Sequence, residues 1–316
     1  SKSWVFLPTM LYITLRSDAV PVTKLEITNR QSFANGESFG DVGVYELLEG
    51  TAHFAVDPLN ERNTAITDLE LAPRDSDGKV QFSAGFAMLQ PVNPERGTRR
   101  ILFDVVNRGR KTALSLNRVP AATDPTAPLA PGNGFLMRHG YTVVWCGWQH
   151  DVPLGNTGGL RAYVPEAANT RGRIAVTFQP NEAATTQMLS DRKHLPYPAD
   201  PLDQPDAQLS VQEYADGPNT VLPRSEWAFG GLEDGNLVPD ASHICMAKGF
   251  EPGKVYRCIY TTATAPVVGL GIAAVRDLIS HLRYSDTADN PGAGDIQHAL
   301  AFGSSQSGRF LSLILL

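Results

Sequence analysis

The hydrophobic and polar positions of residues 24–95 alternate with the two-residue period of β-strands that have one buried face. A Ser-Asp-Gly sequence at 76–78 separates two of these runs in the manner of a hairpin turn. The pattern therefore predicts an antiparallel, β-rich N-terminal region. The alternating runs are KLEIT at 24–28, TAHFAVDP at 51–58, ITDLELAP at 66–73 and KVQFSAGFAMLQPV at 79–92.

The pattern changes near residue 100, where the apolar runs become nearly continuous. Such runs are typical of strands that are buried on both faces, as the strands of parallel sheets are. We therefore predict four further strands. They are RRILFDVVNRG at 99–109, YTVVWCGWQ at 141–149, RIAVTFQ at 173–179 and KVYRCIYTT at 254–262.

The C-terminal part of the chain favours a helix, a strand and a second helix. Within 265–285, apolar residues recur at helical spacing, at positions 268, 272, 275, 278, 279 and 282. HALAFG at 298–303 predicts a strand, and the residues from about Gln306 onward predict another helix. Strands and helices in this order are typical of a parallel α/β sheet.

Residues 152–245 are rich in Pro, Asp, Asn and Gly and have only weak periodicity, which predicts long loops and short helices. We therefore expect three parts along the chain. Residues 1–23 form a leader or the remnant of a signal peptide, and residues 24–95 form the β-rich region. Residues 96–316 form an α/β core with an insertion at about 152–245.

The N-terminus carries a lysine and then an apolar stretch from Trp4 to Leu15. This stretch is too short to span a bilayer, and it is similar to the charged and apolar parts of a secretory signal peptide. A first β-strand and a cloning remnant are equally good interpretations. A signal remnant indicates a periplasmic or secreted protein, and the other interpretations indicate a cytoplasmic one. No other segment is apolar enough to predict a membrane partner.

Composition narrows the class of partner. With 42% hydrophobic and 19% charged residues and a net charge of -6, the chain has the make-up of a soluble globular protein. Its longest basic run is RGRK at 108–111, so a nucleic-acid partner is not expected. The three cysteines lack the CxxC spacing of zinc and redox sites. Cys245 and Cys258 either pair in a secreted protein or, like Cys146, are small buried apolar residues.

The sequence FGSSQSGRF at 302–310 places three serines between a predicted strand and a predicted helix. A nucleophile on so tight a turn requires small residues two positions before it and two positions after it. Ser305 meets this requirement best, because Gly303 precedes it and Ser307 follows it. The N-terminus of a helix favours negative charge, so the backbone N–H of Gln306 is predicted to form half of an oxyanion hole.

This strand–G-x-S-x-S-G-R–helix arrangement resembles the nucleophile elbow of α/β-hydrolases, and glucuronoyl esterases have a similar G-x-S-[RQ]-x-G pattern. The chain is also similar to the bacterial family of α/β-hydrolase domain-containing proteins. The resemblance implies an α/β-hydrolase-type, mostly parallel sheet that is incomplete at its C-terminal end, and a serine esterase without metal or organic cofactor. The similar segments are LEITNRQSFANGESFGDVGVYELLEGTAHFAVDP, ILFDVVNRGRK, YTVVWCGWQ, GFEPGKVY, PVVGLGIAAVRD and FGSSQSGRFL.

The resemblance also implies further site residues. In that fold a loop after a core strand supplies the second oxyanion donor, and the matching loop here contains Arg108 and Gly109. The strand at 141–149 ends at the edge where parallel sheets bind ligands, so Trp148 and Gln149 are predicted to contact substrate. The alternatives are a solvated turn at 107–111 and a tryptophan that only packs in the core.

A catalytic acid and a histidine follow the nucleophile in that family, and the eleven residues after Ser305 contain neither. His150 is the best replacement base, because it lies at a strand end on the side of Ser305. We therefore expect a portion of a longer hydrolase that acts on small-molecule esters, either as a homo-oligomer or with a complementing C-terminal segment. The alternatives are a catalytically inactive binding or scaffold protein, and a peptidase or acyl transferase.

Overall fold

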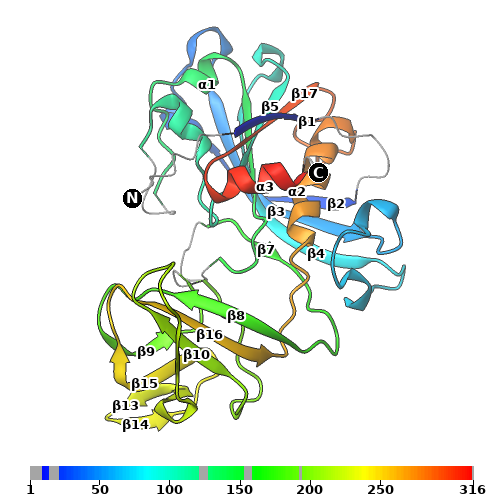
Figure 1. Ribbon diagram of the computed structural model, residues 1–316. Coiled ribbons are helices and arrows are strands. Elements are labelled where there is room, and N and C mark those ends of the chain that lie inside the picture. The colour runs from blue at the N-terminus through cyan, green and yellow to red at the C-terminus, as the bar shows by residue number, and fades with distance from the viewer. Residues whose placement is uncertain (1–8, 14–20, 121–126, 153–158, 192–193, 315–316) are drawn as a thin grey trace. The chain divides into compact units, whose positions relative to one another are not determined.

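The structure is a computed structural model that describes residues 9–13, 21–120, 127–152, 159–191 and 194–314. The chain divides into two compact units (Figure 1). Unit 1 comprises residues 1–165 and 267–316, and unit 2 comprises residues 166–266. Unit 2 is therefore an insertion between two parts of unit 1.

Unit 1 is built on a mixed sheet of eight described strands, in the order β1-β17-β5-β6-β4-β3-β2, with β7 paired to β4. Strand β5 pairs in parallel with β17 on one side and with β6 on the other. The other pairings described for this sheet are antiparallel. The strands are β1 (Thr9–Ile13), β2 (Val22–Ser32), β3 (Tyr45–Val56), β4 (Val80–Pro91), β5 (Arg100–Val105), β6 (Thr142–Cys146), β7 (Ala162–Tyr163) and β17 (His298–Gly303).

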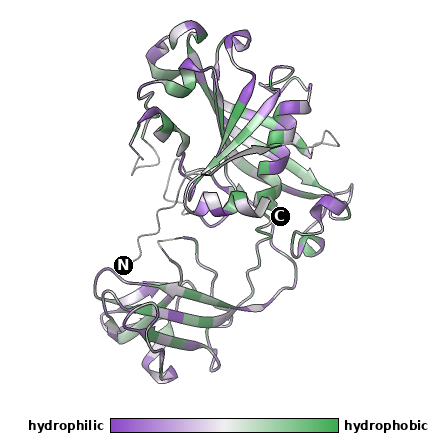
Figure 2. Ribbon diagram, turned by 45° about the horizontal axis from the view of Figure 1, so that its top comes forward, coloured by the Kyte–Doolittle hydropathy of each residue, from purple (hydrophilic) through white to green (hydrophobic). Residues whose placement is uncertain are grey.

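The parallel strands are buried on both faces. Leu102 of β5 pairs with Val143 of β6, and both side chains belong to a hydrophobic cluster that also contains residues of the helix at 135–138. Ile101 and Phe103 point to the opposite face of the sheet and are equally buried. Figure 2 shows the resulting hydrophobic colour along the central strands. Burial of both faces explains why these segments are almost continuously apolar.

Three α-helices are described, and all belong to unit 1: α1 (Phe135–Arg138), α2 (Leu270–Tyr284) and α3 (Gln306–Ile314). Helix α3 lies against β17 and β5, and α2 contacts β2, β4, β6 and β7. The helix predicted from apolar spacing within 265–285 is confirmed as α2. Short 3-10 helices are η1 (Phe33–Gly36), η2 (Gly40–Val42), η3 (Glu61–Asn63), η4 (Leu69–Leu71), η5 (Pro94–Arg96), η6 (Ala113–Asn117) and, in unit 2, η7 (Arg224–Glu226).

Unit 2 consists of antiparallel strands around an aromatic core. The sheets run β11-β10-β16-β8, β12-β15-β9 and β13-β14. In the core the Phe178 ring stacks on Tyr256, with centroids 5.6 Å apart, and Trp227 meets Phe229 edge to face at 5.5 Å. The strands are β8 (Gly172–Phe178), β9 (Ala184–Met188), β10 (Gln208–Gln212), β11 (Thr220–Leu222), β12 (Trp227–Phe229), β13 (Gly231–Glu233), β14 (Asn236–Val238), β15 (His243–Phe250) and β16 (Val255–Thr262).

The prediction of an α/β-hydrolase-type, mostly parallel sheet is wrong. The structure has 38% strand and 18% helix, and its described sheets are mixed or antiparallel, so they do not form the mostly parallel sheet of an α/β-hydrolase. A continuous apolar run indicates burial on both faces, but it carries no information about the direction of the neighbouring strand. The strands predicted at 173–179 and 254–262 exist as β8 and β16, and they pair with each other antiparallel.

Some of the other predictions of secondary structure are confirmed, and others are wrong. The strands predicted at 24–28, 51–58 and 79–92 are confirmed within β2, β3 and β4. The alternating run at 66–73 instead forms η4 and turns, with Asp68 at φ 60°. The long loops predicted for 152–245 are wrong, because this region contains β7 to β14, whereas η7 is a short helix of the kind predicted there. Strands such as β9 (ATTQM) are polar, and their backbone ladder leaves no hydrophobic period in the sequence.

The structure also bears on two questions that the sequence left open, the N-terminal apolar stretch and the state of the cysteines. Residues 9–13 form β1, which pairs antiparallel with β17, while residues 1–8 and 14–20 of the leader prediction lie outside the described residues. The three cysteines are free and buried. Burial raises the pKa of both Cys146 and Cys258 to about 12. The cysteines therefore behave as small buried residues and not as a disulfide pair.

Candidate active site

The turn between β17 and α3 holds Ser305 in a left-handed backbone conformation, with φ at 60°. Positive φ is uncommon for a residue other than glycine, and such strain concentrates at functional sites. Position 303 also has to be glycine, because an added Cβ would lie 2.6 Å from the carbonyl oxygen of Ser307. The strand and the helix therefore approach as closely as a nucleophile turn requires.

The first residues of α3 present polar groups beside Ser305. Gln306 begins the helix, so no preceding helical turn supplies an acceptor for its backbone N–H. The side-chain Oε1 of Gln306 and Oγ of Ser307 are buried and have no partner among the described residues. The helix N-terminus thus offers a backbone donor, together with its positive dipole end, next to the nucleophile.

A second turn lies beside the nucleophile turn, because β5 is the parallel neighbour of β17. The backbones of Asn107 and Arg110 exchange two hydrogen bonds of 3.1 Å. Between them, Arg108 has a φ of 50° and Gly109 a φ of 78°. Two positive values in succession define a type I′ turn. The side-chain Nδ2 of Asn107 donates to the carbonyl oxygen of Ser304 at 3.1 Å. Asn107 therefore ties the end of β5 to the nucleophile turn.

The backbone N–H of Arg108, the predicted second oxyanion donor, is already engaged. It donates to Oε1 of the buried Gln149 at 3.0 Å. The side chain of Arg108 points toward the nucleophile turn, since its Nη1 donates to Oδ1 of Asn107 at 3.3 Å. The backbone of Arg108 is therefore engaged within the turn, and Gln149 supports the turn.

Gly109 and Trp148 hold this edge of the sheet together. The carbonyl oxygen of Gly109 accepts from the backbone N–H of Leu160 at 3.0 Å. The indole Nε1 of Trp148 donates to the carbonyl oxygen of Val106 at 2.8 Å, and its ring lies 4.6 Å from that of Phe310 in α3. Trp148 therefore packs between the end of β5 and the helix that carries the nucleophile.

His150 lies on the same edge, and its carbonyl oxygen accepts from Nη2 of Arg161. Among the residues that the structure describes, no histidine is hydrogen-bonded to Oγ of Ser305. Histidine–carboxylate contacts occur elsewhere. In unit 2, Nδ1 of His243 lies 2.7 Å from Oδ2 of Asp240, and hydrogen bonds from the backbone of residue 242 and from His243 lower the pKa of that carboxyl group.

Asp104 supports the site and was missed by the sequence analysis. Its buried carboxylate accepts from the N–H and Oγ1 of Thr112, the N–H of Ala113 and Nε1 of Trp145. Burial raises the pKa of Asp104, and these four hydrogen bonds oppose the rise. The carboxylate thereby anchors the chain after the 107–110 turn to the C-terminal end of β5. A lone aspartate within ILFDVV was the available signal.

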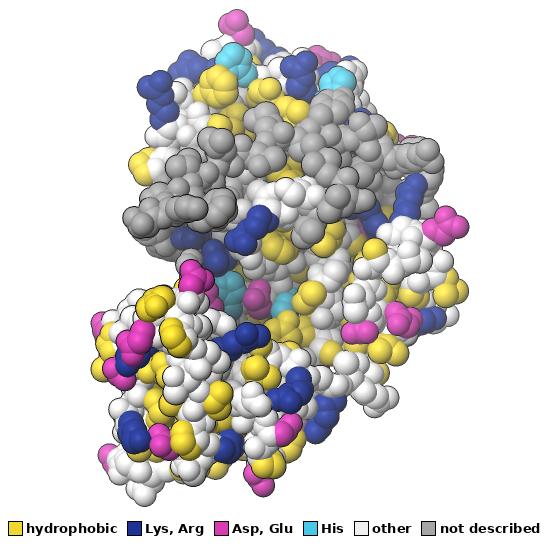
Figure 3. Space-filling model, viewed as in Figure 1, with side chains coloured by type: hydrophobic (Ala, Val, Ile, Leu, Met, Phe, Trp, Pro, Cys, Tyr) yellow, Lys and Arg dark blue, Asp and Glu magenta, His cyan; other side chains and the backbone are white. Residues whose placement is uncertain are grey.

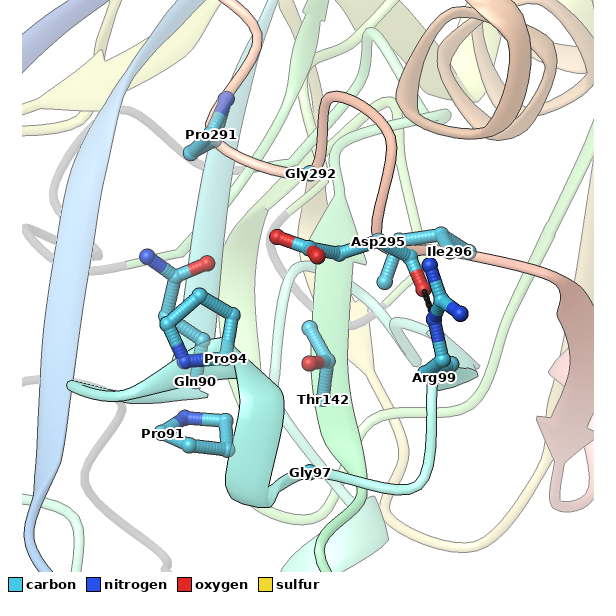
Figure 4. A pocket seen from close by; sticks show the side chains of 10 residues that line it. All are labelled: Gln90, Pro91, Pro94, Gly97, Arg99, Thr142, Pro291, Gly292, Asp295 and Ile296. Atoms are coloured by element: carbon cyan, nitrogen blue, oxygen red, sulfur yellow. Dashed lines mark hydrogen bonds between the residues drawn. The ribbon is translucent and has the colours of Figure 1, made fainter.

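A pocket lies at the opposite edge, where β5, β6 and β17 begin (Figure 4). It measures about 300 Å³, including space open to solvent, and its charged lining residues are Arg99 and Asp295. The guanidinium of Arg99 donates to the carbonyl oxygens of Gly294 and Asp295, at 2.8 and 3.1 Å. None of the site residues predicted from the sequence lines this pocket, so the nucleophile edge is the stronger candidate.

The described residues contain no group of three or more His, Cys, Asp or Glu side chains arranged to hold a metal ion. Within the same residues, no helix has the length and apolar character needed to cross a membrane. Comparisons with protein-family models, with curated proteins and with solved structures find no match to this chain. The serine chemistry inferred from the sequence therefore stays a prediction, supported by the geometry of the turn.

Proposed function

We propose that the protein is a serine hydrolase that cleaves carboxylic esters through an acyl-enzyme on Ser305. The conformation of Ser305 carries this proposal, because left-handed strain at a serine between a strand and a helix exposes its hydroxyl and costs free energy. The close packing of Gly303 on the backbone of residue 307 supports the same interpretation, since it forces the turn to be tight.

The proposed chemistry uses groups on this edge of the sheet. Oγ of Ser305 attacks the ester carbonyl carbon, a base removes the hydroxyl proton, and that proton passes to the departing alcohol. Water then attacks the acyl-enzyme, releases the carboxylic acid and restores the serine. The backbone N–H of Gln306 stabilises the oxyanion, and the guanidinium of Arg108 adds positive charge beside it.

The proton acceptor in this proposal is His150. It follows β6, which lies two strands from β17, a separation of about 10 Å at the usual strand spacing. A base has to reach the serine hydroxyl directly or through one water, so the imidazole has to turn toward β17 when substrate binds. General-base catalysis contributes about a hundredfold or more to the rate, which makes its loss easy to measure.

The test is labelling with a fluorophosphonate probe, read by intact mass and peptide mapping, together with hydrolysis of p-nitrophenyl butyrate. We expect one adduct per chain, located on Ser305, and no adduct or hydrolysis with Ser305→Ala. Ser312→Ala is the matched control, because this exposed serine lies on α3 and its hydroxyl donates to the carbonyl oxygen of Gly308. The control variant should label like the parent protein.

Two other outcomes would change the proposal. A folded protein that neither labels nor hydrolyses the ester would contradict it and favour the inactive binding or scaffold protein. If Ser305 is labelled at an unchanged rate in His150→Asn, Ser305 is still the nucleophile, but His150 is not its base.

A further inference from the structure

Arg161 lies at the end of β6, close to the turn that follows β5. Its carbonyl oxygen accepts from the N–H of Gly85 at 3.0 Å, and the next residue, Ala162, donates to the carbonyl oxygen of Gln149 at 2.9 Å. Gly147 passes so close that an added Cβ would lie 2.4 Å from the backbone of Arg161. The position of Arg161 is therefore set by β4 and by the residues that follow β6.

The guanidinium of Arg161 is incompletely paired. Nη2 donates to the carbonyl oxygen of His150, and Cζ lies 5.1 Å from the ring centroid of Tyr163. Nε and Nη1 are buried and have no acceptor among the described residues. None of the ion pairs that the structure describes involves Arg161.

A guanidinium remains charged at every pH at which a protein is folded, so Arg161 cannot relieve this burial by losing a proton. Donor atoms that are shielded from water without an acceptor are costly, and the guanidinium of such an arginine is typically paired with a carboxylate or a phosphate. The second hydrogen of Nη2, together with Nη1 or with Nε, forms an edge that binds a carboxylate through two parallel hydrogen bonds. The side chain thus has the chemistry of a subsite for a carboxylate.

The distance to the nucleophile suits a substrate group. Arg161 adjoins the end of β6, and Ser305 follows β17, two strands away and therefore about 10 Å across the sheet. Between them lies the turn of β5, where Arg108 supplies a second guanidinium. An ester bound at Ser305 with a chain of several carbon atoms would bring its far end to Arg161.

We propose that Arg161 binds the free carboxylate of the substrate, so that the enzyme prefers half-esters of dicarboxylic acids over neutral esters. This proposal rests on the proposed ester hydrolysis at Ser305. It assigns Arg161 a specificity role that the sequence did not indicate, because the residue lies in a region predicted to be a loop.

The binding test uses Ser305→Ala protein, which cannot turn the ligand over. Monomethyl adipate and dimethyl adipate are compared by calorimetry and thermal shift. We expect the anionic half-ester to bind and the neutral diester to bind at least about tenfold more weakly, because one charged hydrogen-bonded pair is lost. In the double variant Ser305→Ala/Arg161→Gln, the two esters should bind with equal affinity. Arg161→Lys should keep part of it, and Arg138→Gln, at an exposed arginine of the same unit, should keep all of it.

The kinetic test compares the p-nitrophenyl half-ester of adipic acid with p-nitrophenyl hexanoate in the parent protein. Arg161→Gln should lower kcat/KM for the anionic substrate by about tenfold to a hundredfold and leave the neutral one unchanged. Equal affinity for the two adipate esters, or a preference that persists in folded Arg161→Gln, would overturn the proposal. If neither p-nitrophenyl ester is hydrolysed, the proposed function fails. The comparison of the two adipate esters by calorimetry still decides whether Arg161 binds a carboxylate.

Discussion

At the scale of single residues, the nucleophile turn depends on the absence of a side chain at Gly303. A side chain there would meet backbone atoms of α3 and not the flexible end of another side chain. Backbone cannot yield by a rotamer change, so any larger residue has to push α3 away from β17. The same displacement would relax the backbone at Ser305, which couples the stability of the turn to the reactivity of the serine.

Gly303→Ala is expected to lower the free energy of unfolding by about 1–3 kcal/mol, as overpacking of a close contact does. Fluorophosphonate labelling of Ser305 should slow in the same variant, although the nucleophile itself is unchanged. Thermal melts and labelling rates measure the two effects. The control is Gly172→Ala, because an added Cβ at that position has no neighbour within 4 Å. An unperturbed melt and label rate for Gly303→Ala would show that the turn is not tight.

At the scale of elements, α2 contains a buried titratable group away from the nucleophile edge. The side chain of His281 is almost fully buried, and its Nε2 has no partner among the described residues. Burial lowers the pKa of His281, and the negative charge of Asp289 partly opposes this shift. The native protein therefore holds His281 neutral at a pH at which the unfolded chain already protonates it.

This linkage has a definite sign. The unfolded state binds the additional proton below a pH of about 6.5, so the stability contributed by neutral His281 is lost as the pH falls from there. We expect the melting temperature to fall between pH 7.5 and pH 5.0, and to fall less in His281→Asn. His139→Asn, at an exposed histidine, should keep the pH dependence of the parent protein. An identical pH profile for His281→Asn would contradict the assignment.

At the scale of the whole molecule, the chain enters and leaves unit 2 at neighbouring points. The N–H of Ala167 donates to the carbonyl oxygen of Ala265 at 2.9 Å, and a β-bridge joins Glu166 to Pro266. Unit 2 also has its own hydrophobic core. On the face of this unit seen in Figure 3, acidic, basic and hydrophobic side chains are interspersed. These are the properties of a domain inserted into another.

Residues 166–266 expressed alone are therefore expected to fold and to melt cooperatively. Trp227 is the single tryptophan of this segment and is buried, so its emission should shift to the red on unfolding. Phe250→Ala, which removes a ring packed against Phe178 and Tyr256, should lower the free energy of unfolding by about 3–5 kcal/mol. A gradual, non-cooperative melt of the isolated segment would mean that unit 2 depends on the rest of the chain.

Much of the candidate site was predictable, because its signals are local. Ser305, Gln306 and the turn at 107–110 lie within a few residues of the strands and the helix that position them. The roles of Arg108 and Gln149 were not predictable, since a hydrogen bond joins residues that are far apart in the chain. Arg161 had no signal, because neither its burial nor its missing partners depend on the residues next to it.

Side-chain periodicity was enough to predict most strands of unit 1 and its helices α2 and α3, although the run at 66–73 forms η4, and small residues were enough to predict a tight turn between β17 and α3. These features follow from side-chain periodicity and from the space around a single glycine, and both are properties of neighbouring residues. The tertiary structure was needed for the direction of strand pairing and for the bounds and sheets of unit 2, of which the sequence predicted only an insertion at about 152–245. It also decided which polar groups meet at the edge of the sheet. Pairing depends on contacts between distant segments, and such contacts leave no period in the sequence.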